Sequence, residues 1–390
     1  MTKSIHADID QTVRISGRRF EQSPYFDCYA HAGIVLGVYA GRFYPKSVGD
    51  DPAECYWALR RYAAMYDVPE RPVQIEGPDA VPFLERIFAR HVATLKEGRG
   101  RYAIACTPQG GVFMDGLLFK LSEGTFWYVQ PDGALETWLI AHSEGFDVHI
   151  SDPKSRVIQI QGPRSLEVMR AASDGEIDER MGYFHADYFN LGGQRLYVSR
   201  TGWTGELGFE IYSQGAKTDH RRLWDHLNKT GSPHGMVFSS AASMETRRIE
   251  AGILDNGTDM DMTMTPHQAG LGAFIDLEKP DFVGRSALLE ADQRTCLYGM
   301  KCPTATPAMN CDIADGDQIV GRVTAGAWSP FLECGIGYVR FNEPGEWAGR
   351  GLSVQMGESD NHPCEIVELP FYDREKRIAR GLDKSIPELT

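Results

Sequence analysis

The chain has 390 residues, a length that suggests two or three domains. Its 42% hydrophobic and 24% charged residues are typical of a globular protein, and its net charge of −14 argues against a nucleic-acid partner. No apolar run approaches the roughly 20 residues of a membrane span, and the first ten residues lack the apolar core of a signal peptide. We therefore expect a cytoplasmic protein with no membrane partner.

The eight cysteines form no Cys-x-x-Cys pair. In a cytoplasmic chain they are expected to be reduced and mostly buried thiols. A zinc site would need tighter clusters with histidine at ligand spacing, so no metal site is predicted.

Strands and helices are both predicted along the chain. Helices are expected where apolar residues recur with helical spacing, at 52–65, 134–142, 220–228 and 239–251. Strands are expected where apolar and polar residues alternate, at 102–107, 112–121, 126–129, 195–199 and 209–212. After residue 307 short strands broken by Gly and Pro, at 318–324, 335–340, 352–356 and 365–369, indicate a small β-rich terminal domain.

An internal repeat links two distant segments. Val73-Gln-Ile-Glu-Gly-Pro78 and Ile158-Gln-Ile-Gln-Gly-Pro163 each alternate like a strand, turn at Gly-Pro and lead into helical spacing. Chance similarity over twelve positions is the alternative, but a duplication of one α+β module is favoured.

One segment combines a turn with a strand that carries a carboxylate. It reads Arg200-Thr-Gly-Trp-Thr-Gly-Glu-Leu-Gly-Phe-Glu-Ile-Tyr212. Its small residues permit a tight turn with close ligand approach. In the strand, Glu210 and Tyr212 share the face opposite Phe209. An ionised Glu210 would match a heterocycle edge with two parallel N–H donors, although periodicity alone favours a solvated glutamate on an edge strand.

The chain has no Gly-x-Gly-x-x-Gly after an early strand and no Walker loop. A dinucleotide or nucleoside-triphosphate enzyme is therefore not supported.

The 200–212 segment resembles the Arg-Thr-Gly-Tyr-Thr-Gly-Glu-x-Gly-Phe-Glu-Ile stretch of the glycine-cleavage T-protein (aminomethyltransferase) superfamily. Further ordered similarities cover most of the chain. They are Tyr66-Asp-Val68, Gly110-Gly111 with Asp115, Arg248-Ile-Glu-Ala-Gly252, Thr265-Pro-x-x-Ala-Gly-Leu271, Ser329-Pro330 and Pro370-Phe-Tyr372.

The resemblance implies an α+β fold built as a three-domain ring, with two related α+β domains that contain antiparallel sheets and a C-terminal β-barrel-like domain. The expected boundaries are 1–60 with 151–285 for a discontinuous folate-binding domain, 61–150 for the second α+β domain and 286–390 for the β-rich domain. A homo-oligomer is left open.

The resemblance also implies a cofactor, tetrahydrofolate, and the residues that bind it. Glu210 corresponds to the carboxylate that holds the pterin ring, and Trp203 stands where the family has a tyrosine. Tyr372 and Arg374, or else Arg377, are expected near the p-aminobenzoyl-glutamate tail.

The chain departs from the family at positions expected to carry chemistry. An ungapped alignment from Gly110-Gly111 puts Met114 at the family's first acidic position and Asp115 at the second. The resemblance implies that the first position holds the catalytic acid beside the folate, so Met114 is expected to line the folate site. A thioether cannot transfer a proton. A family Arg-Asp pair falls on Met244-Glu245, and Pro69-Glu70 replaces Ser-His.

These departures weaken the reading as a glycine-cleavage component, and the stretches Tyr66–Ala80 and Arg247–Leu254 instead resemble the superfamily's tetrahydrofolate-dependent demethylases. We therefore expect transfer of a methyl group from a small methylated substrate, an aryl methyl ether or a sulfonium compound, to folate N5. A sulfonium donor needs no proton donor, whereas an aryl ether benefits from one. Candidate acids are Asp115, His31, Tyr39, Tyr44 and His91, although a structural role is favoured for each residue taken alone.

A carboxylate on the substrate would attract Arg90 or Arg101, although surface salt bridges explain both residues as well. Two other functions are left open. One is a glycine-cleavage aminomethyltransferase, whose partner is a lipoyl carrier protein and whose product is 5,10-methylenetetrahydrofolate. The other is a non-catalytic folate-binding protein, whose Lys-Gly-Cys motif is absent.

Overall fold

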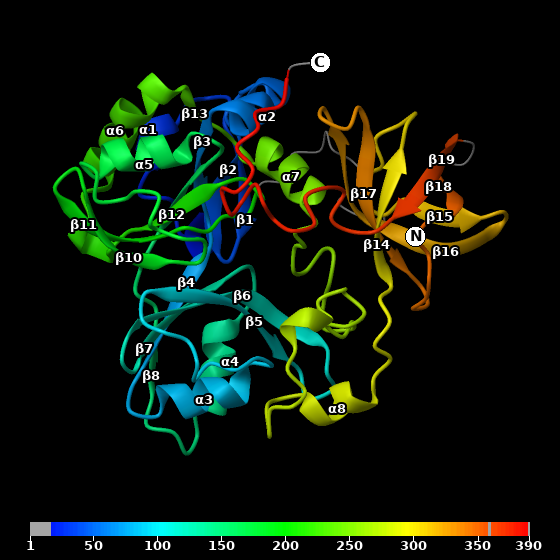
Figure 1. Ribbon diagram of the computed structural model, residues 1–390, viewed down its shortest axis with the longest axis horizontal. Helices are drawn as coiled ribbons and strands as arrows, with labels where there is room; N and C mark the ends of the chain where they lie inside the picture. Colours follow the sequence, from blue (N-terminus) through cyan, green and yellow to red (C-terminus); the bar gives the residue numbers. More distant parts are fainter. Residues whose placement is uncertain (1–16, 358–359, 389–390) are drawn as a thin grey trace.

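The computed structural model describes residues 17–357 and 360–388. Three units surround a common centre: an upper and a lower α+β unit, and a barrel beside them (Figure 1). This architecture confirms the predicted fold class. Residues 1–16 of the predicted first domain lie outside the described residues.

The first unit contains a six-stranded sheet. Its strands, in spatial order, are β10 (Ala186–Leu191), β11 (Gln194–Ser199), β12 (Gly208–Tyr212), β9 (Val157–Gln161), β3 (Ala63–Val68) and β13 (Met236–Phe238). All pairs are antiparallel except β13 with β3. Apolar residues of α5 (Ser165–Ala172) and α6 (His220–Gly231) share one core with this sheet.

The second unit is a five-stranded antiparallel sheet. Its strands, in spatial order, are β5 (Arg99–Cys106), β6 (Val112–Ser122), β7 (Thr125–Gln130), β4 (Arg71–Glu76) and β8 (His149–Ser151). Helices α3 (Ala80–Ile87) and α4 (Leu135–His142) supply the other half of its core.

The sequence repeat occupies equivalent places in the two units. In each, a strand (β4 or β9) turns at Gly-Pro into a helix (α3 or α5). Gly77 and Gly162 both have a positive φ, of 140° and 123°, and a side chain at either would meet backbone atoms closer than 3 Å. Only glycine fits this conformation and close approach, so the matched Gly-Pro turns reflect a shared geometry.

The third unit is a closed six-stranded barrel. Its strands, in spatial order, are β14 (Leu297–Cys302), β17 (Cys334–Phe341), β16 (Gln318–Ser329), β15 (Asp312–Asp315), β18 (Gly351–Gly357) and β19 (Asp360–Val367). The segment from residue 251 to 296, with α8 (Arg285–Glu290), runs between the second unit and the barrel (Figure 1). Its apolar residues join the barrel core.

A two-stranded hairpin and two further helices belong to the first unit and lie between its sheet and the centre of the molecule. They are β1 (Val35–Tyr39), β2 (Arg42–Ser47), α2 (Pro52–Arg61) and α7 (Ala241–Glu250). The short elements are α1 (Phe26–Tyr29) and the 3₁₀ turns Gly17–Arg19, Gly215–Lys217, Ser232–His234 and Gly272–Phe274.

The predicted helix at 52–65 is too long. The helix ends at Arg61, and β3 begins at Ala63. Ala63, Ala64 and Met65 are good helix formers, but strand pairing with β9 and burial outweigh that weak preference. Because β3 belongs to the six-stranded sheet, the first unit extends beyond the predicted boundary at residue 60.

Within the described residues, the helices are too short or too polar to cross a membrane. All eight cysteines are free thiols.

Candidate functional site

Glu210 lies on the face of β12 that points to the centre of the molecule. Phe209 and Ile211 point the other way, into the core of the first unit, and Tyr212 shares the central face with Glu210. This is the alternation that the sequence predicts. Glu210 is only 5% exposed, so it is not a solvated surface glutamate.

A set of hydrogen-bond donors surrounds the Glu210 carboxylate. Gln159 Nε2 donates to Oε1 over 2.9 Å from the neighbouring strand β9. The hydroxyls of Thr201, Tyr212 and Ser199 donate to Oε2. Burial raises the pKa of Glu210, and the three hydroxyl donors oppose that rise because they stabilise the charged form.

Two buried polar atoms on the central face of this sheet have no hydrogen-bond partner among the described residues. They are Gln159 Oε1 and the Tyr197 hydroxyl, both buried. Gln159 and Glu210 are directly opposed across β9 and β12, so the unpaired Gln159 Oε1 lies on the strand next to the Glu210 carboxylate. Buried polar groups are normally paired, and these two orphans therefore indicate a polar ligand.

Aromatic side chains border the same region. Phe119 and Trp127 of the second unit form one buried cluster with Tyr197 and Tyr212 of the first, and Trp203 packs against it. The guanidinium of Arg248 lies 5.2 Å above the Trp203 ring. A flat heterocycle would find apolar and aromatic walls here.

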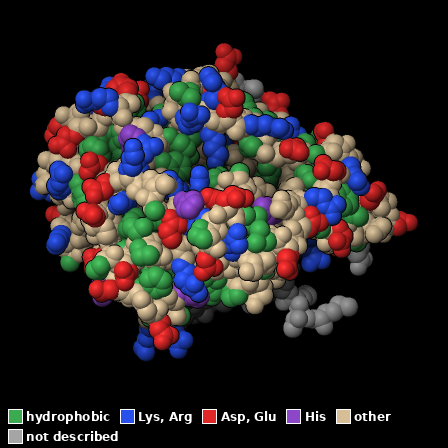
Figure 2. Space-filling view, turned by 60° about the horizontal axis from the view of Figure 1, so that its bottom comes forward, with side chains coloured by type: hydrophobic (Ala, Val, Ile, Leu, Met, Phe, Trp, Pro, Cys, Tyr) green, Lys and Arg blue, Asp and Glu red, His purple; other side chains and the backbone are tan. Residues whose placement is uncertain are grey.

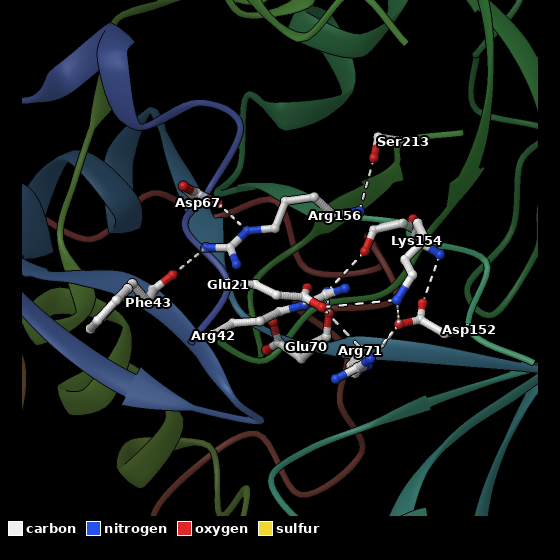
Figure 3. Close-up of polar contacts among 11 residues, drawn as sticks. Glu21, Arg42, Phe43, Asp67, Glu70, Arg71, Asp152, Lys154, Arg156 and Ser213 are labelled. Atoms are coloured by element: carbon white, nitrogen blue, oxygen red, sulfur yellow. Dashed lines mark hydrogen bonds and ion pairs between the residues drawn. The ribbon is translucent and has the colours of Figure 1, made fainter. Parts of the chain in front are cut away.

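Glu70 is a second carboxyl near Glu210. Its main chain is fixed where the two connections between the α+β units meet, since Arg42 Nη1 donates to the carbonyls of Glu70 (3.0 Å) and Ser155 (2.8 Å) (Figure 3). Its Oε2 atom is buried and receives no hydrogen bond from the described residues. Burial, and then the charge of Glu210, raise the pKa of Glu70 to about 8.

The cations around Glu70 are already paired. Arg156 Nε donates to Asp67 over 2.8 Å, and Arg71 binds Asp152 (Figure 3). Glu70 forms no ion pair within the described part of the chain, which is why burial can hold it protonated at neutral pH.

Met114 and Asp115 point to opposite faces of β6. Met114 lies in the core between the second sheet and its helices, with its methyl group near Gly133. Met114 is therefore buried in this core and does not line the centre, contrary to its predicted place beside folate. Successive side chains of a strand point to opposite faces, so only one of Met114 and Asp115 can face the centre. Asp115 takes the central face, and the acid that the alignment seemed to lack is therefore present one residue later.

Asp115 is 8% exposed and only half paired. Tyr102 donates to Oδ2 over 2.8 Å, while Oδ1 has no partner in residues 17–357 or 360–388. Burial, supported by the charge of Asp255, raises the pKa of Asp115 to about 6. Asp115 can therefore take up and release a proton near neutral pH.

Tyr39 and Tyr44 of the β1–β2 hairpin both lie near Asp255. The Tyr39 hydroxyl donates to Asp255 Oδ1 over 3.0 Å. Burial, and then the charges of Asp255 and Glu70, raise the pKa of Tyr39. Burial, and then Glu245 and Asp255, raise that of Tyr44. Both phenols stay protonated and can donate, but they are not acids at neutral pH.

The remaining predicted residues lie elsewhere. His31 is exposed and bonds the Val48 carbonyl, and His91 faces Glu85 and Asp276. Arg90 bonds the Tyr102 carbonyl and stacks on Phe274, and Arg101 bonds the His91 carbonyl and Thr94. Neither arginine joins the central carboxyls, and Arg374 is exposed.

Tyr372 is part of a buried network between α7, α2 and the barrel. Its hydroxyl donates to Glu250, which also accepts from Tyr56 and Ser329, and Arg247 lies 5.2 Å from its ring. These contacts give Tyr372 a structural role in joining the units.

Two surface clefts contain none of the predicted residues. One, of about 850 Å³, lies between the barrel and residues 257–268, and the other, of about 210 Å³, lies beside Arg42 and His220. The face in Figure 2 carries interspersed acidic and basic side chains, with a hollow near its upper middle. No group of three His, Cys, Asp or Glu in the described ranges is arranged to hold a metal ion.

Sequence reasoning missed Gln159, Asp255 and Asn256, and it treated Glu70 only as the loss of a family residue. Gln159 had a signal in the repeat, where a polar residue stands between Ile158 and Ile160 on a strand. The other three depend on packing between units, which spacing along the chain does not encode.

Comparison with known proteins agrees with this geometry. Two related α+β units and a closed barrel define the class of T-protein-like folds. Residues 27–279 match the GCVT N-terminal domain, and residues 296–373 match the glycine cleavage T-protein C-terminal barrel domain. The chain belongs to the glycine cleavage T-protein family, as the sequence predicts.

Its relatives match over nearly their whole length. Aminomethyltransferases of Streptomyces avermitilis and Bacillus subtilis are 31% and 26% identical to it, over 88% and 91% of this chain and 95% and 99% of their own. The crystal structure of glycine cleavage system aminomethyltransferase T from Bartonella henselae has a TM-score of 0.81 and 24% identity, covering 90% of this chain and 98% of that one. The family uses tetrahydrofolate in one-carbon chemistry, which confirms the predicted cofactor.

Proposed function

We propose that this chain transfers a one-carbon unit to tetrahydrofolate whose pterin ring binds at Glu210. The observation that carries the proposal is the buried and oriented Glu210 carboxylate with the unpaired acceptor Gln159 Oε1 on the adjacent strand. Glu210 Oε1 accepts one hydrogen bond, from Gln159 Nε2, and has a second lone pair for a ligand. A pterin edge offers two parallel N–H donors, which two parallel acceptors can receive. Charge-assisted bonds of this kind contribute about 1.5–3 kcal/mol each.

The residues around the acceptors fit a folate. Oε2 of Glu210 is already satisfied by three hydroxyls, which fixes the carboxylate. Oε1 accepts from Gln159 alone, so its second lone pair is open to the ligand. Trp203 and the aromatic cluster offer flat walls for the ring. Bound tetrahydrofolate supplies the nitrogen atoms that accept the carbon.

The donor that the relatives favour is an aminomethyl group on a lipoyl carrier protein. The curated relatives are named aminomethyltransferases. In that reaction the carbon leaves sulfur and nitrogen for two folate nitrogens, and the two displaced folate protons end on the sulfur and on the ammonia released. Such a reaction needs proton transfer, and Asp115, with its unpaired Oδ1 and a pKa of about 6, is the group suited to it.

A second candidate is methyl transfer from a small methylated compound. The observation that favours it is Glu70, since Pro69-Glu70 stands in place of a family Ser-His and brings a carboxyl whose pKa is about 8 near Glu210. A changed group this close to the pterin site is consistent with a changed donor.

One experiment separates the candidates. The full chain is incubated with tetrahydrofolate and either aminomethylated lipoyl carrier protein or a panel of methylated amines, sulfonium compounds and aryl methyl ethers. Formation of 5,10-methylenetetrahydrofolate from the carrier supports the first candidate, and 5-methyltetrahydrofolate from a panel member supports the second. Absence of tetrahydrofolate binding by calorimetry would refute both.

A further inference from the structure

The smaller of the two clefts lies between β2, residues 154–156 and the start of α6, and its lining is mostly cationic. Its volume is about 210 Å³, below the roughly 300 Å³ at which pockets for larger organic ligands begin. Its charged lining residues are Arg42, Lys154, Arg156 and Glu21. A positive lining is unexpected in a chain whose net charge is −14, so the cleft calls for a ligand of opposite charge.

Two of the lining residues are buried arginines that lie together. Arg42 Nη1 donates to the Ser155 carbonyl over 2.8 Å. Arg156 Nη2 donates to the Phe43 carbonyl over 2.7 Å. The carbonyl that each arginine binds therefore belongs to the residue next to the other arginine in sequence. Burial lowers the pKa of Arg42; the charge of Glu21 opposes this shift, and the like charge of Arg156 adds to it.

Three donors at the cleft have no acceptor. The Ser155 hydroxyl is fully buried and has no hydrogen-bond partner among the described residues. Nη2 of Arg42 and Nη1 of Arg156 also form no hydrogen bond with residues 17–357 or 360–388, although the other nitrogens of both guanidiniums do. All three residues line the cleft, so a group with several acceptor oxygens could receive all three donors there.

The ion pairs around the cleft leave one positive charge in excess. Each cation touches a carboxylate, but four cations share three carboxylates (Figure 3). The cations are Arg42, Arg71, Lys154 and Arg156, and the carboxylates are Glu21, Asp67 and Asp152. Glu70 does not restore the balance at neutral pH, because burial and then the charge of Glu210 raise its pKa to about 8. One further negative charge would balance this network.

We propose that this cleft binds a small oxyanion, a phosphate or carboxylate group, between Arg42 and Arg156, with the Ser155 hydroxyl as a further donor. A guanidinium presents parallel N–H donors that match the oxygens of either group. Arg42 Nε already donates to the carboxylate of Glu21 over 3.0 Å, so a carboxylate reaches this guanidinium from a residue of the same lining. The site is separate from the proposed pterin site, because none of the residues that bond Glu210 lines the cleft.

Binding of simple anions to the full chain tests the proposal. Inorganic phosphate, acetate and chloride are titrated by calorimetry against the wild type, Ser155→Ala and the exposed control Ser232→Ala. We expect phosphate or acetate to bind at least about tenfold more tightly than chloride, and the tighter of the two tells a phosphate ligand from a carboxylate ligand. Ser155→Ala should weaken that oxyanion about threefold to tenfold, the effect of one hydrogen bond, and Ser232→Ala should not change it.

A second variant tests the charge and leaves the buried arginines in place. The Lys154 side chain is 64% exposed, so Lys154→Gln should fold as the wild type does. We expect it to weaken the oxyanion about twofold to fivefold, whereas Lys229→Gln, at the exposed end of α6, should have no effect. Unchanged oxyanion binding in folded Ser155→Ala or Lys154→Gln would overturn the proposal, and so would equal binding of the oxyanions and chloride.

Tetrahydrofolate added to the same samples tests whether the two sites are separate. The affinity for the oxyanion should be the same with and without saturating tetrahydrofolate. Displacement of the oxyanion by tetrahydrofolate would mean that the cleft takes a carboxylate of the folate itself, which would overturn the assignment of a separate site. The oxyanion site does not depend on the proposed function, since it is measured without a one-carbon donor.

Discussion

Glu210 and Asp115 are buried carboxyls that face the same centre from the sheets of two related units, yet they are equipped differently. Glu210 accepts from four side chains, and three of them bind one oxygen. Asp115 accepts from Tyr102 alone and keeps the other oxygen unpaired. Both have a raised pKa because both are buried.

The difference separates binding from chemistry. A carboxylate with many donors is fixed in position and orientation, which suits recognition of a rigid ring. A carboxyl with one donor and a pKa of about 6 changes its protonation state easily, which suits proton transfer. Duplication thus supplied two scaffolds, and the side chains around each carboxyl gave it a separate task.

The largest expected effect comes from removing the half-paired carboxyl. Asp115→Asn should lower the rate of one-carbon transfer by about 10²–10⁴-fold, the usual contribution of a general acid or base, while tetrahydrofolate binding is retained. Single-turnover kinetics with the active donor and calorimetry with tetrahydrofolate measure the two quantities.

The pH dependence sharpens this expectation. In the wild type, kcat/KM should fall as pH drops through about 6, because a protonated Asp115 can no longer accept a proton. The Asp115→Asn variant should not show this fall of kcat/KM at low pH, whereas the control Asp317→Asn, in an exposed turn, should show it. Loss of folate binding in Asp115→Asn with an unchanged transfer rate would reverse the assignment of the two carboxyls.

Placing a carboxyl on the other face of β6 tests the geometry itself. Met114→Asp should destabilise the protein by about 3–5 kcal/mol, because an unpaired carboxyl would lie in the core of the second unit. It should add no activity. Met114→Leu, which conserves volume, should cost less than about 1.5 kcal/mol. Chemical denaturation measures both, and a stable, more active Met114→Asp variant would show that position 114 faces the centre.

Position 114 also shows where sequence reasoning stops. The repeat and the face that Glu210 shares with Tyr212 were predictable, because Gly-Pro turns and two-residue alternation are local signals. The face of β6 on which Met114 and Asp115 lie could not be predicted. A bulge shifts the pairing of β6 with β5 between Met114 and Val112, and an ungapped alignment does not show which side chain then points to the centre. Asp255 became part of the site only through packing between units.

The fully paired carboxylate should matter for binding and less for stability. Glu210→Gln should weaken tetrahydrofolate by about 10–100-fold, which corresponds to one lost charge-assisted bond of about 1.5–3 kcal/mol. The exposed control Glu144→Gln should not change the affinity. Calorimetry provides the measurement, and an unaltered dissociation constant in Glu210→Gln would mean that the pterin binds elsewhere.

Glu70 is a third buried carboxyl, and its expected effect is a slope of stability against pH rather than a change in the rate or affinity at one pH. Its pKa is raised by burial and by the charge of Glu210, from 4.5 to about 8, so the folded protein holds a proton that the unfolded chain has lost. The stability due to that proton is complete below about pH 4.5 and is lost as pH rises toward 8, at up to about 1.4 kcal/mol per pH unit. Glu70→Gln keeps the shape without the ionisation, so its stability relative to the wild type should increase between pH 5 and pH 8, whereas the exposed control Glu123→Gln should follow the wild type. Urea denaturation at several pH values measures this difference in the free energy of unfolding. If the pH dependence is the same for Glu70→Gln and the wild type, Glu70 is solvated and its pKa is not raised by burial or by Glu210.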